Sequence, residues 1–401
     1  MSKKLSIRDL PLQGKKTLIR VDFNVPQDSS GNITDDTRIQ SSLNTINYVI
    51  DHGGIPILMS HLGRPKGSVK PQYSLAPCAE RLSKFLGKDV IMAPNCIGPE
   101  VQQLVSNLKQ DQVLLLENLR FHQGEEKPNE DPSFAKELSS LGDLYINDAF
   151  GTAHRAHAST VSIAQFFPKA SASGFLLEKE ITFLGENLLN PQKPFYAIIG
   201  GAKVSTKLGV IESLIKKVDG LIIVGGMAFT FLKAQNISIG NSLCEDSLLQ
   251  TSLDVCESCK KHNTHLLLPE DFVIAKSLNN DAKTKIVKVA QGIENGYMGL
   301  DIGPLSIKNI EILLKNSSTI FWNGPAGVCE LSSFAKGTQT IAKFLANSSA
   351  LTIIGGGDSV AAIKTTGLEN NITHISTGGG AALEYIQFGH LPGIEALSPL
   401  S

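Results

Sequence analysis

The sequence predicts an α/β protein built on two doubly wound parallel sheets. Its 401 residues are too many for one ordinary core, which favours two domains. Short, continuously apolar runs recur along the chain, as in parallel strands covered on both faces. Helix-like stretches separate these runs, giving successive βαβ units.

The first domain is predicted over residues 1–172. Each of its apolar runs is expected to form a strand, and the polar residues after the run are expected at the carboxyl edge of the sheet, where ligands bind in such folds. The runs open the stretches KTLIRVDFNVP (16–26), GIPILMSHLGRP (54–65), VLLLENLRF (113–121) and LYINDAFGTAH (144–154).

A single amphipathic helix is predicted over 173–190 as the connection between the domains. Leu177, Ile181, Leu184 and Leu188 recur at helical spacing, and Pro191 follows the end. The second domain, 191–388, repeats the pattern in FYAIIGGAKVS (195–205), GLIIVGGMAF (220–229), THLLLPEDF (264–272), TIFWNGPAG (319–327) and ALTIIGGGDS (350–359).

Composition excludes several classes of protein. A formal net charge of −1 argues against a non-specific nucleic-acid binder. The N-terminus lacks an apolar segment of the secretory type, and the longest apolar stretch, GLIIVGGMAFTFL, is too short to span a membrane. Six scattered cysteines suggest reduced thiols, so a cytoplasmic protein is expected.

All seven arginines lie within the first 155 residues. Arg20, Arg64, Arg120 and Arg155 follow successive predicted strands, and Arg38 is near them in sequence. Arginine grips carboxylate and phosphate through two hydrogen bonds, so the first half is predicted to hold a small anion. The segment GTAHRAHAST (151–160) is interpreted as part of this anion-binding site, or anion clamp. In it, His154 and His157 are expected to supply positive potential or hydrogen bonds beside Arg155.

The second half instead carries glycine at its strand ends, which favours a nucleotide phosphate site. The usual P-loop and dinucleotide fingerprints are absent. Lys203 and Lys207 are expected on one face at a helix start, in contact with phosphate. Asp358 follows a triple glycine and is expected to hold Mg²⁺ on the nucleotide, although a helix cap is the plainer alternative. The glycines are Gly200–Gly201, Gly225–Gly226, Gly324, Gly355–Gly357 and Gly378–Gly380.

A zinc site is the alternative for Cys256, Cys259, His262 and His265. The stretch containing both cysteines looks helical, and ligands spaced in this way on one rigid helix do not converge on a tetrahedral ion. A surface helix running into the strand of THLLLP is therefore the preferred interpretation, and the role of this cluster stays open.

Taken together, the motifs resemble those of the phosphoglycerate kinase family along the whole chain. The resemblance rests on RVDFNVP, HLGRP, LLENLRF, NDAFGTAHRAH, GGAKVSTK, GGMAFTF, MGLDIGP, WNGPAG, GGGDS and STGGGA, in this order. It implies two Rossmann-like domains, a C-terminal segment (389–401) that packs back on the first, and a monomer without nucleic-acid or membrane partners.

The resemblance also implies the reaction and its residues. The reaction is reversible phosphoryl transfer between ATP and the carboxylate of 3-phosphoglycerate, in glycolysis and gluconeogenesis, with Mg²⁺ as cofactor. Arg38 and Lys207 are the expected catalytic residues, and Asp358 the metal ligand. The expected substrate contacts are Asp22, Asn24, Arg38, His61, Arg64, Arg120 and Arg155. The expected nucleotide contacts are Lys203, Lys207, Gly299, Leu300, Asn323, Glu330, Gly355, Gly356, Gly357, Asp358 and Ser359.

The implied reaction agrees with the candidate residues, which include no general base. A carboxylate acceptor is already ionised at neutral pH and needs none. The domains are expected to close by hinge bending, since the reactants bind to different domains. Three departures from the family pattern are Asn95, Glu270 and Cys329, the last beside the expected ribose contact. Two rival functions are a nicotinamide-dependent dehydrogenase and an RNA-binding module.

Overall fold

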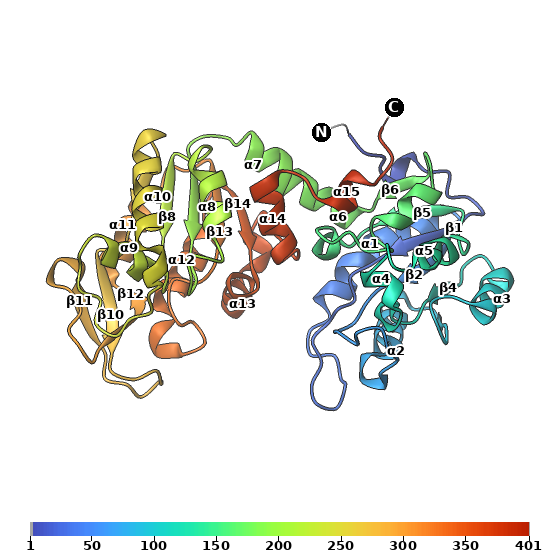
Figure 1. Ribbon diagram of the computed structural model, residues 1–401, viewed down its shortest axis with the longest axis horizontal. Coiled ribbons are helices and arrows are strands. Elements are labelled where there is room, and N and C mark those ends of the chain that lie inside the picture. The colour runs from blue at the N-terminus through green and yellow to red at the C-terminus, as the bar shows by residue number, and fades with distance from the viewer. Residues whose placement is uncertain (1–2, 401) are drawn as a thin grey trace. The chain divides into compact units, whose positions relative to one another are not determined.

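The computed structural model describes residues 3–400 and divides into two compact units (Figure 1). The first unit runs up to Ile181 and includes the stretch from His390 on, and the second runs from Thr182 to Gly389. Each unit contains a six-stranded parallel sheet with helices around it. The predicted α/β class with two parallel sheets is therefore confirmed.

The sheet of the first unit has the strand order β3-β4-β2-β1-β5-β6, and all neighbours are parallel. The chain builds outward from β1 to one side and then returns to β5 on the other side. Ligands bind at such a reversal, beyond the carboxyl end of the central strands. The strands are β1 (Lys16–Arg20), β2 (Ile55–Met59), β3 (Val90–Met92), β4 (Val113–Leu115), β5 (Leu144–Asn147) and β6 (Ser171–Ser173).

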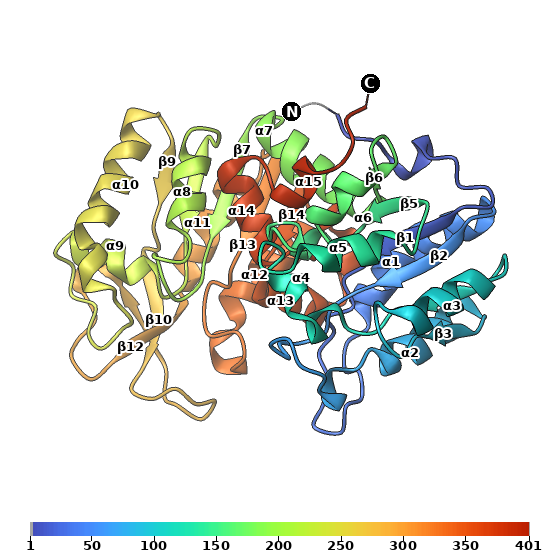
Figure 2. The ribbon, with the colours of Figure 1, turned by 45° about the vertical axis from the view of Figure 1, so that its right-hand side comes forward.

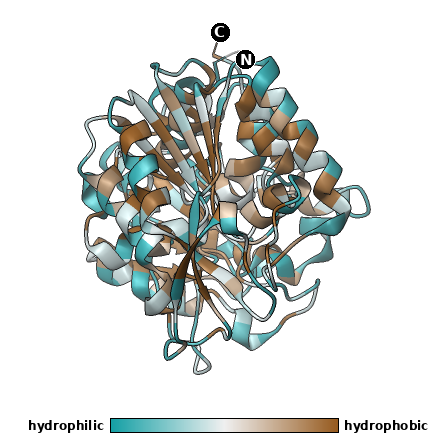
Figure 3. Cartoon of the chain, turned by 90° about the vertical axis from the view of Figure 1, so that its left-hand side faces the viewer, coloured by the Kyte–Doolittle hydropathy of each residue, from teal (hydrophilic) through white to brown (hydrophobic). Residues whose placement is uncertain are grey.

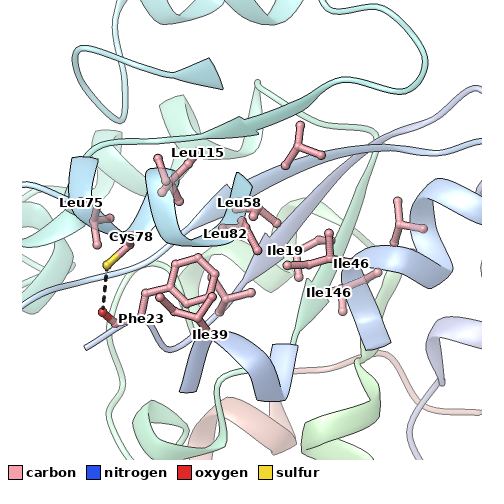
Figure 4. Packing of buried hydrophobic residues seen from close by; sticks show 14 of the residues in the cluster. Ile19, Phe23, Ile39, Ile46, Leu58, Leu75, Cys78, Leu82, Leu115 and Ile146 are labelled. Carbon is pink, nitrogen blue, oxygen red and sulfur yellow. Dashed lines mark hydrogen bonds between the residues drawn. The ribbon is translucent and has the colours of Figure 1, made fainter. Parts of the chain in front are cut away.

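Helix α1 shows how the sequence builds this unit's core. Its apolar residues Ile39, Ile46 and Val49 recur at helical spacing and are fully buried. Figure 4 shows Ile39 and Ile46 packed with Ile19 and Leu58 of the sheet. The main helices of the unit are α1 (Thr37–Asp51), α2 (Ala76–Leu86), α3 (Pro99–Asn107) and α5 (Pro132–Ser139).

The sheet of the second unit has the order β9-β8-β7-β13-β14-β15. This is the Rossmann strand order, and its reversal point lies between β7 and β13, where a nucleotide is expected. The strands are β7 (Phe195–Ile199), β8 (Gly220–Ile223), β9 (His265–Leu267), β13 (Thr319–Asn323), β14 (Leu351–Gly355) and β15 (His374–Ile375).

Two groups of helices cover this sheet. Helix α8 packs against α14 and α10 (Figure 2), whereas α12 packs against α11 and α13. Figure 3 shows the apolar strands between helices whose outward turns are hydrophilic. The helices are α8 (Leu208–Ile215), α9 (Ala228–Ala234), α10 (Leu249–Lys261), α11 (Pro304–Leu314), α12 (Lys336–Ala346), α13 (Gly357–Thr366) and α14 (Gly380–Phe388).

A small antiparallel sheet, which sequence analysis did not predict, adds to the second unit. It comprises β10 (Asp271–Ala275), β11 (Lys285–Lys288) and β12 (Met298–Ile302), in the order β11-β10-β12. The sequence signal is weak because β11 is mostly exposed and has lysine at both ends. This sheet positions β12, whose residues contribute to the candidate site.

The connection between the units is helical from residue 175 to 189 but is not one regular α-helix. A π-helical segment, Ile181–Glu186, separates α6 (Phe175–Glu180) from α7 (Asn187–Leu189). Leu177, Leu184 and Leu188 are buried, in agreement with the apolar spacing.

The C-terminal stretch belongs to the first unit. In α15 (Pro392–Glu395), the amide of Gly393 donates to the Ala153 carbonyl over 2.8 Å, and Asn147 Nδ2 donates to the Gly393 carbonyl over 3.2 Å. Among residues 3–400, none of the helices has both the length and the apolarity that crossing a bilayer requires.

Candidate active site

A basic cluster forms at the carboxyl edge of the first sheet. Asp22, two residues beyond β1, forms an ion pair with Arg38 in the first turn of α1. Both groups keep some exposure, with 13% for the Asp22 side chain and 33% for Arg38. The acid therefore offsets part of the cluster's positive charge while leaving Arg38 accessible to a ligand.

The loop after β2 is held from two sides through Gly63. Its amide donates to Asn24 Oδ1 over 2.9 Å, and its carbonyl accepts from Arg120 Nη1 over 3.0 Å. Glycine is required here, because φ is +63° and a Cβ atom would lie 2.4 Å from the Tyr73 ring. The contacts fix the neighbouring His61 and Arg64 relative to Asn24 and Arg120, so residues from three strand ends meet.

Arg120 and Arg64 differ in their surroundings. Arg120 is partly buried and lies 3.2 Å from Glu126 Oε1 through Nε, while burial lowers its pKa. Arg64 is exposed, and its positive charge is a minor cause of the lowered Arg120 pKa, after burial and Arg20. Repulsion of this kind is relieved when an anion binds.

Arg20 does not reach a ligand, which corrects its assignment to the anion pocket from sequence. It is 1% exposed, and its Nε donates to Ser159 Oγ over 2.8 Å. Ser159 Oγ donates in turn to Glu125 Oε1 over 2.7 Å. Arg20 ends a strand whose final four residues are buried, so its guanidinium is directed into the unit.

His61 and His157 contribute hydrogen-bonding groups rather than charge. Burial, with Arg120 and Arg20 nearby, lowers the pKa of His157 to about 3, so the ring is neutral at physiological pH. This corrects the expectation that His157 supplies positive potential. Arg155 is exposed, and its Nε donates to His154 Nε2 over 2.9 Å. Arg155 is therefore the permanently cationic group of the HRAH segment, and it is exposed.

The second unit contains a cavity of about 500 Å³ at the reversal point of its sheet. The predicted residues Gly299, Leu300, Glu330 and Asp358 line it together. Sequence analysis gave the apolar part of the lining no role, although Phe229 and Met298 lie within the motifs GGMAFTF and MGLDIGP. That part includes Phe229, Leu243, Phe272, Leu278, Met298 and Val328.

Glycine allows the strand ends to meet beside this cavity. A Cβ atom on Gly324, after β13, would lie 2.1 Å from the carbonyl oxygen of Gly200, after β7. Gly324 also has a φ of +97°, which side-chain-bearing residues rarely adopt. Gly299 has a different constraint, because its Cβ would meet the Phe229 ring at 2.1 Å. The backbone is thereby brought close to the space where a ligand would bind.

Lys207 and Asn323 form a polar pair at the same edge. Lys207 Nζ donates to Asn323 Oδ1, and burial lowers the lysine pKa while Asp358 opposes that change. Asn323 is fully buried, and its Nδ2 has no hydrogen-bond partner within residues 3–400. Gly356 has a φ of +90°, and a Cβ there would lie 2.9 Å from this Nδ2. The loop of Gly355–Gly357 therefore lies directly against Asn323.

One predicted detail is wrong, and the nucleotide contact expected of Ser359 stays a prediction. Lys203 is not on a helix face with Lys207, because α8 begins only at Leu208 and the turn directly before it covers only residues 205–207. Lys203 is exposed on this loop. Ser359 is buried, and its hydroxyl accepts from the Gly324 amide over 2.6 Å. The hydroxyl of Ser359 therefore supports the loop after β13 and is not presented to the cavity.

The remaining candidates lie away from this site. Cys256 and Cys259 are on α10, as the helical interpretation predicts, and His262 caps that helix. Within residues 3–400, no three histidine, cysteine or acidic side chains are grouped so that they could hold a metal ion. Two departures from the family pattern have partners: Asn95 Oδ1 lies 2.7 Å from His122 Nε2, and Glu270 Oε1 accepts from Asn309 over 2.8 Å.

Comparison with known proteins agrees with this geometry. The sequence profile of the family described as "Phosphoglycerate kinase" matches residues 7–388. The phosphoglycerate kinase of Chlorobaculum tepidum is 52% identical over 398 residues, covering 98% of this chain and 99% of the relative. The cytosolic phosphoglycerate kinase of Nicotiana tabacum is 52% identical over 395 residues, covering 98% and 97%. The structure of phosphoglycerate kinase from Coxiella burnetii matches with a TM-score of 0.88 at 39% identity, covering 98% of both chains. The chain belongs to the phosphoglycerate kinase family.

Proposed function

We propose that this chain carries out the family's reaction, reversible phosphoryl transfer between ATP and the carboxylate of 3-phosphoglycerate, with the phosphoglycerate bound to the first unit and the nucleotide to the second. The two ligands are assigned to the two units because the sites differ in chemistry. One is a cluster of arginines and neutral histidines, and the other is an apolar cavity bordered by glycine loops, Lys207 and Asp358.

The first site suits a small molecule with a phosphate and a carboxylate. Arg38, Arg64, Arg120 and Arg155 come from four different segments, so they can surround an anion and bind it through planar forks. Asp22 and Asn24 are acceptors that suit a substrate hydroxyl. The neutral histidines add donors without increasing repulsion among the arginines.

The second site suits a nucleotide. Its apolar side chains can hold a base, and the exposed carboxylate of Glu330 lies where it can accept hydrogen bonds from a ribose. The N-terminus of α13 follows the glycine loop and offers free amides to phosphate oxygens. The unpartnered Nδ2 of Asn323 is a further donor beside these amides.

The residues at this edge also fit Mg²⁺. Asp358 is exposed and forms no ion pair within residues 3–400. In nucleotide sites Mg²⁺ takes one or two carboxylates and completes its shell with phosphate oxygens and water. Asp358, as a single carboxylate with no larger group of protein ligands around it in residues 3–400, therefore suits Mg²⁺ bound together with a nucleotide. When bound, the ion would neutralise charge on the phosphates.

Catalysis by this chain consists of alignment and charge stabilisation. The carboxylate acceptor is ionised at neutral pH, so no residue has to remove a proton from it. Lys207 and Arg38 are assigned to the charge on the transferring phosphoryl group. The two ligands must approach each other for transfer, so hinge bending that brings the units together remains a prediction.

A coupled assay tests this proposal directly. The purified protein, with ATP, Mg²⁺ and 3-phosphoglycerate, should produce ADP only when all three are present. Absence of turnover, or turnover independent of 3-phosphoglycerate, would overturn it.

The dehydrogenase and RNA-binding alternatives are checked by NADH fluorescence and by a salt-dependent RNA shift assay. We also propose a cytoplasmic location, which the cytosolic tobacco relative supports. We further propose a monomer, which light scattering of the purified protein tests.

A further inference from the structure

The buried guanidinium of Arg20 lies beside the imidazole of His61. Its Nε donates to Ser159 Oγ over 2.8 Å, its Nη1 donates to the Val21 carbonyl, and its Nη2 lies 3.2 Å from His61 Nδ1. All three nitrogens of the planar fork are therefore engaged. Rotation of the guanidinium would break at least one of these contacts.

The partner on the far side of the fork is itself held firmly. The Ser159 amide and hydroxyl donate to the two oxygens of Glu125, over 3.0 and 2.7 Å. The Tyr145 hydroxyl donates to the Ser159 carbonyl over 2.8 Å. Glu125 lies in α4 (Gln123–Glu126) and is fully buried. The chain Glu125–Ser159–Arg20 thus fixes the direction in which Nη2 points.

This contact determines where the His61 ring carries its proton. A guanidinium can only donate hydrogen bonds, so His61 Nδ1 must be the acceptor. The proton of the neutral ring is then on Nε2. Burial, together with Arg20, Arg120 and Arg38, lowers the pKa of His61 well below its ordinary value, so the ring is not a cation at neutral pH. Within residues 3–400 the His61 ring makes no second hydrogen bond.

We propose that Arg20 is a positioning residue that holds His61 as the Nε2–H tautomer, so that a neutral imidazole donates one hydrogen bond to the bound phosphoglycerate. Arg20 does not touch the ligand. The identity of the ligand rests on the proposed function, whereas the tautomer does not. The Nδ1–H tautomer would instead place an N–H group against the cationic fork and leave Nε2 as an acceptor facing an anion.

The tautomer can be observed directly by long-range ¹H–¹⁵N NMR of the ¹⁵N-histidine-labelled, full-length protein near neutral pH. The His61 signals are assigned by their loss in His61→Gln. We expect Nδ1 at the shift of an unprotonated nitrogen and Nε2 at that of a protonated nitrogen. An Nδ1–H tautomer, a mixture, or an imidazolium ion in the wild type would overturn the inference, even if kinase activity is normal. Loss of kinase activity with the expected tautomer would instead count against the proposed function.

Two substitutions of Arg20 distinguish its role in positioning His61 from the effect of its positive charge. Arg20→Met should give mixed His61 tautomers and raise the KM for 3-phosphoglycerate about tenfold, with a small change in kcat, because one hydrogen bond to an anion is weakened. Arg20→Lys keeps the charge but not the fork, so KM should stay raised and the tautomers mixed. Full recovery of KM by lysine would show that charge alone matters and would overturn the inference.

A milder pair of variants guards against misfolding of Arg20→Met. Ser159→Ala removes the hydroxyl that accepts from Arg20 Nε and donates to Glu125, and it should produce a smaller rise in KM than Arg20→Met, with partial mixing of the tautomers. The matched control is Ser171→Ala, which removes another buried serine of the same unit, bonded to Ser398 over 2.8 Å. Ser171→Ala should leave the His61 signals unchanged. Equal changes of those signals in both serine variants would contradict the proposed chain of contacts.

Discussion

The buried carboxyl group of Asp148 should make the stability of the first unit depend on pH. Asp148 follows β5, and its Oδ1 accepts hydrogen bonds from the amides of Leu176 and Leu177 over 2.9 and 3.2 Å, in the first turn of α6. Burial raises the pKa of Asp148 from 3.8 to about 7, although these amides and the Thr45 hydroxyl oppose the change. Oδ2 has no hydrogen-bond partner within residues 3–400.

The sign of the effect follows from the raised pKa. The folded unit holds the Asp148 proton more tightly than the unfolded chain, so stability is fully present below the unfolded pKa near 4 and is lost as pH rises through about 7. Each pKa unit corresponds to about 1.4 kcal/mol, so the complete loss is roughly 4 kcal/mol by pH 8. About 3 kcal/mol of this loss falls between pH 5 and pH 8.

The substitution Asp148→Asn tests this calculation. Asparagine keeps an oxygen acceptor for the α6 amides but cannot ionise. The free energy of unfolding of the variant's first unit, minus that of the wild type, should therefore increase by about 3 kcal/mol from pH 5 to pH 8.

Hydrogen exchange read by mass spectrometry measures this difference in peptides covering β1, α1 and α6. The single tryptophan, Trp322, lies in the second unit, so its fluorescence during unfolding is an internal control that should be unchanged. A difference that stays constant between pH 5 and pH 8 would show that Asp148 does not titrate in this range and would refute the reasoning.

Three further predictions concern the candidate site. Arg155→Ala should raise the KM for 3-phosphoglycerate by about one to two decades, since a hydrogen bond to a charged group contributes roughly 1.5–3 kcal/mol, and should leave nucleotide affinity unchanged. Arg155→Lys should recover only part of this, and an effect on ATP alone would contradict the clamp. Lys207→Ala should lower kcat by about 10²–10³, as for loss of one preorganised donor; a normal kcat with a raised KM for ATP would indicate uniform binding instead. Asp358→Asn should increase the Mg²⁺ concentration needed for half-maximal rate without changing binding of 3-phosphoglycerate, and an unchanged Mg²⁺ titration would exclude the assigned role.

Local sequence alone determined most strands of the two parallel sheets. It also determined that several strands of the first unit are followed by arginine and several strands of the second by glycine. The runs that open KTLIRVDFNVP and FYAIIGGAKVS become β1 and β7, because continuous apolar residues are stable only where helices cover both faces. Glycine after β7 and β13 was readable as a place of close approach. The antiparallel β11 was not readable, because its exposed KIVK has little apolar signal and forms a strand by pairing with β10.

Only the tertiary structure decided which arginine is exposed at the edge of the sheet and that His61 and His157 are neutral. Arg20 and Arg155 both follow apolar runs, yet Arg20 is buried at a strand end and Arg155 is exposed on a loop. The contact of Arg20 with Ser159 joins residues 139 positions apart, and its contact with His61 joins residues 41 apart. Burial and neighbouring charge set the protonation of His61 and His157, and both depend on segments distant in sequence. The sequence therefore specifies which groups are available, whereas packing between distant segments sets their charge and direction.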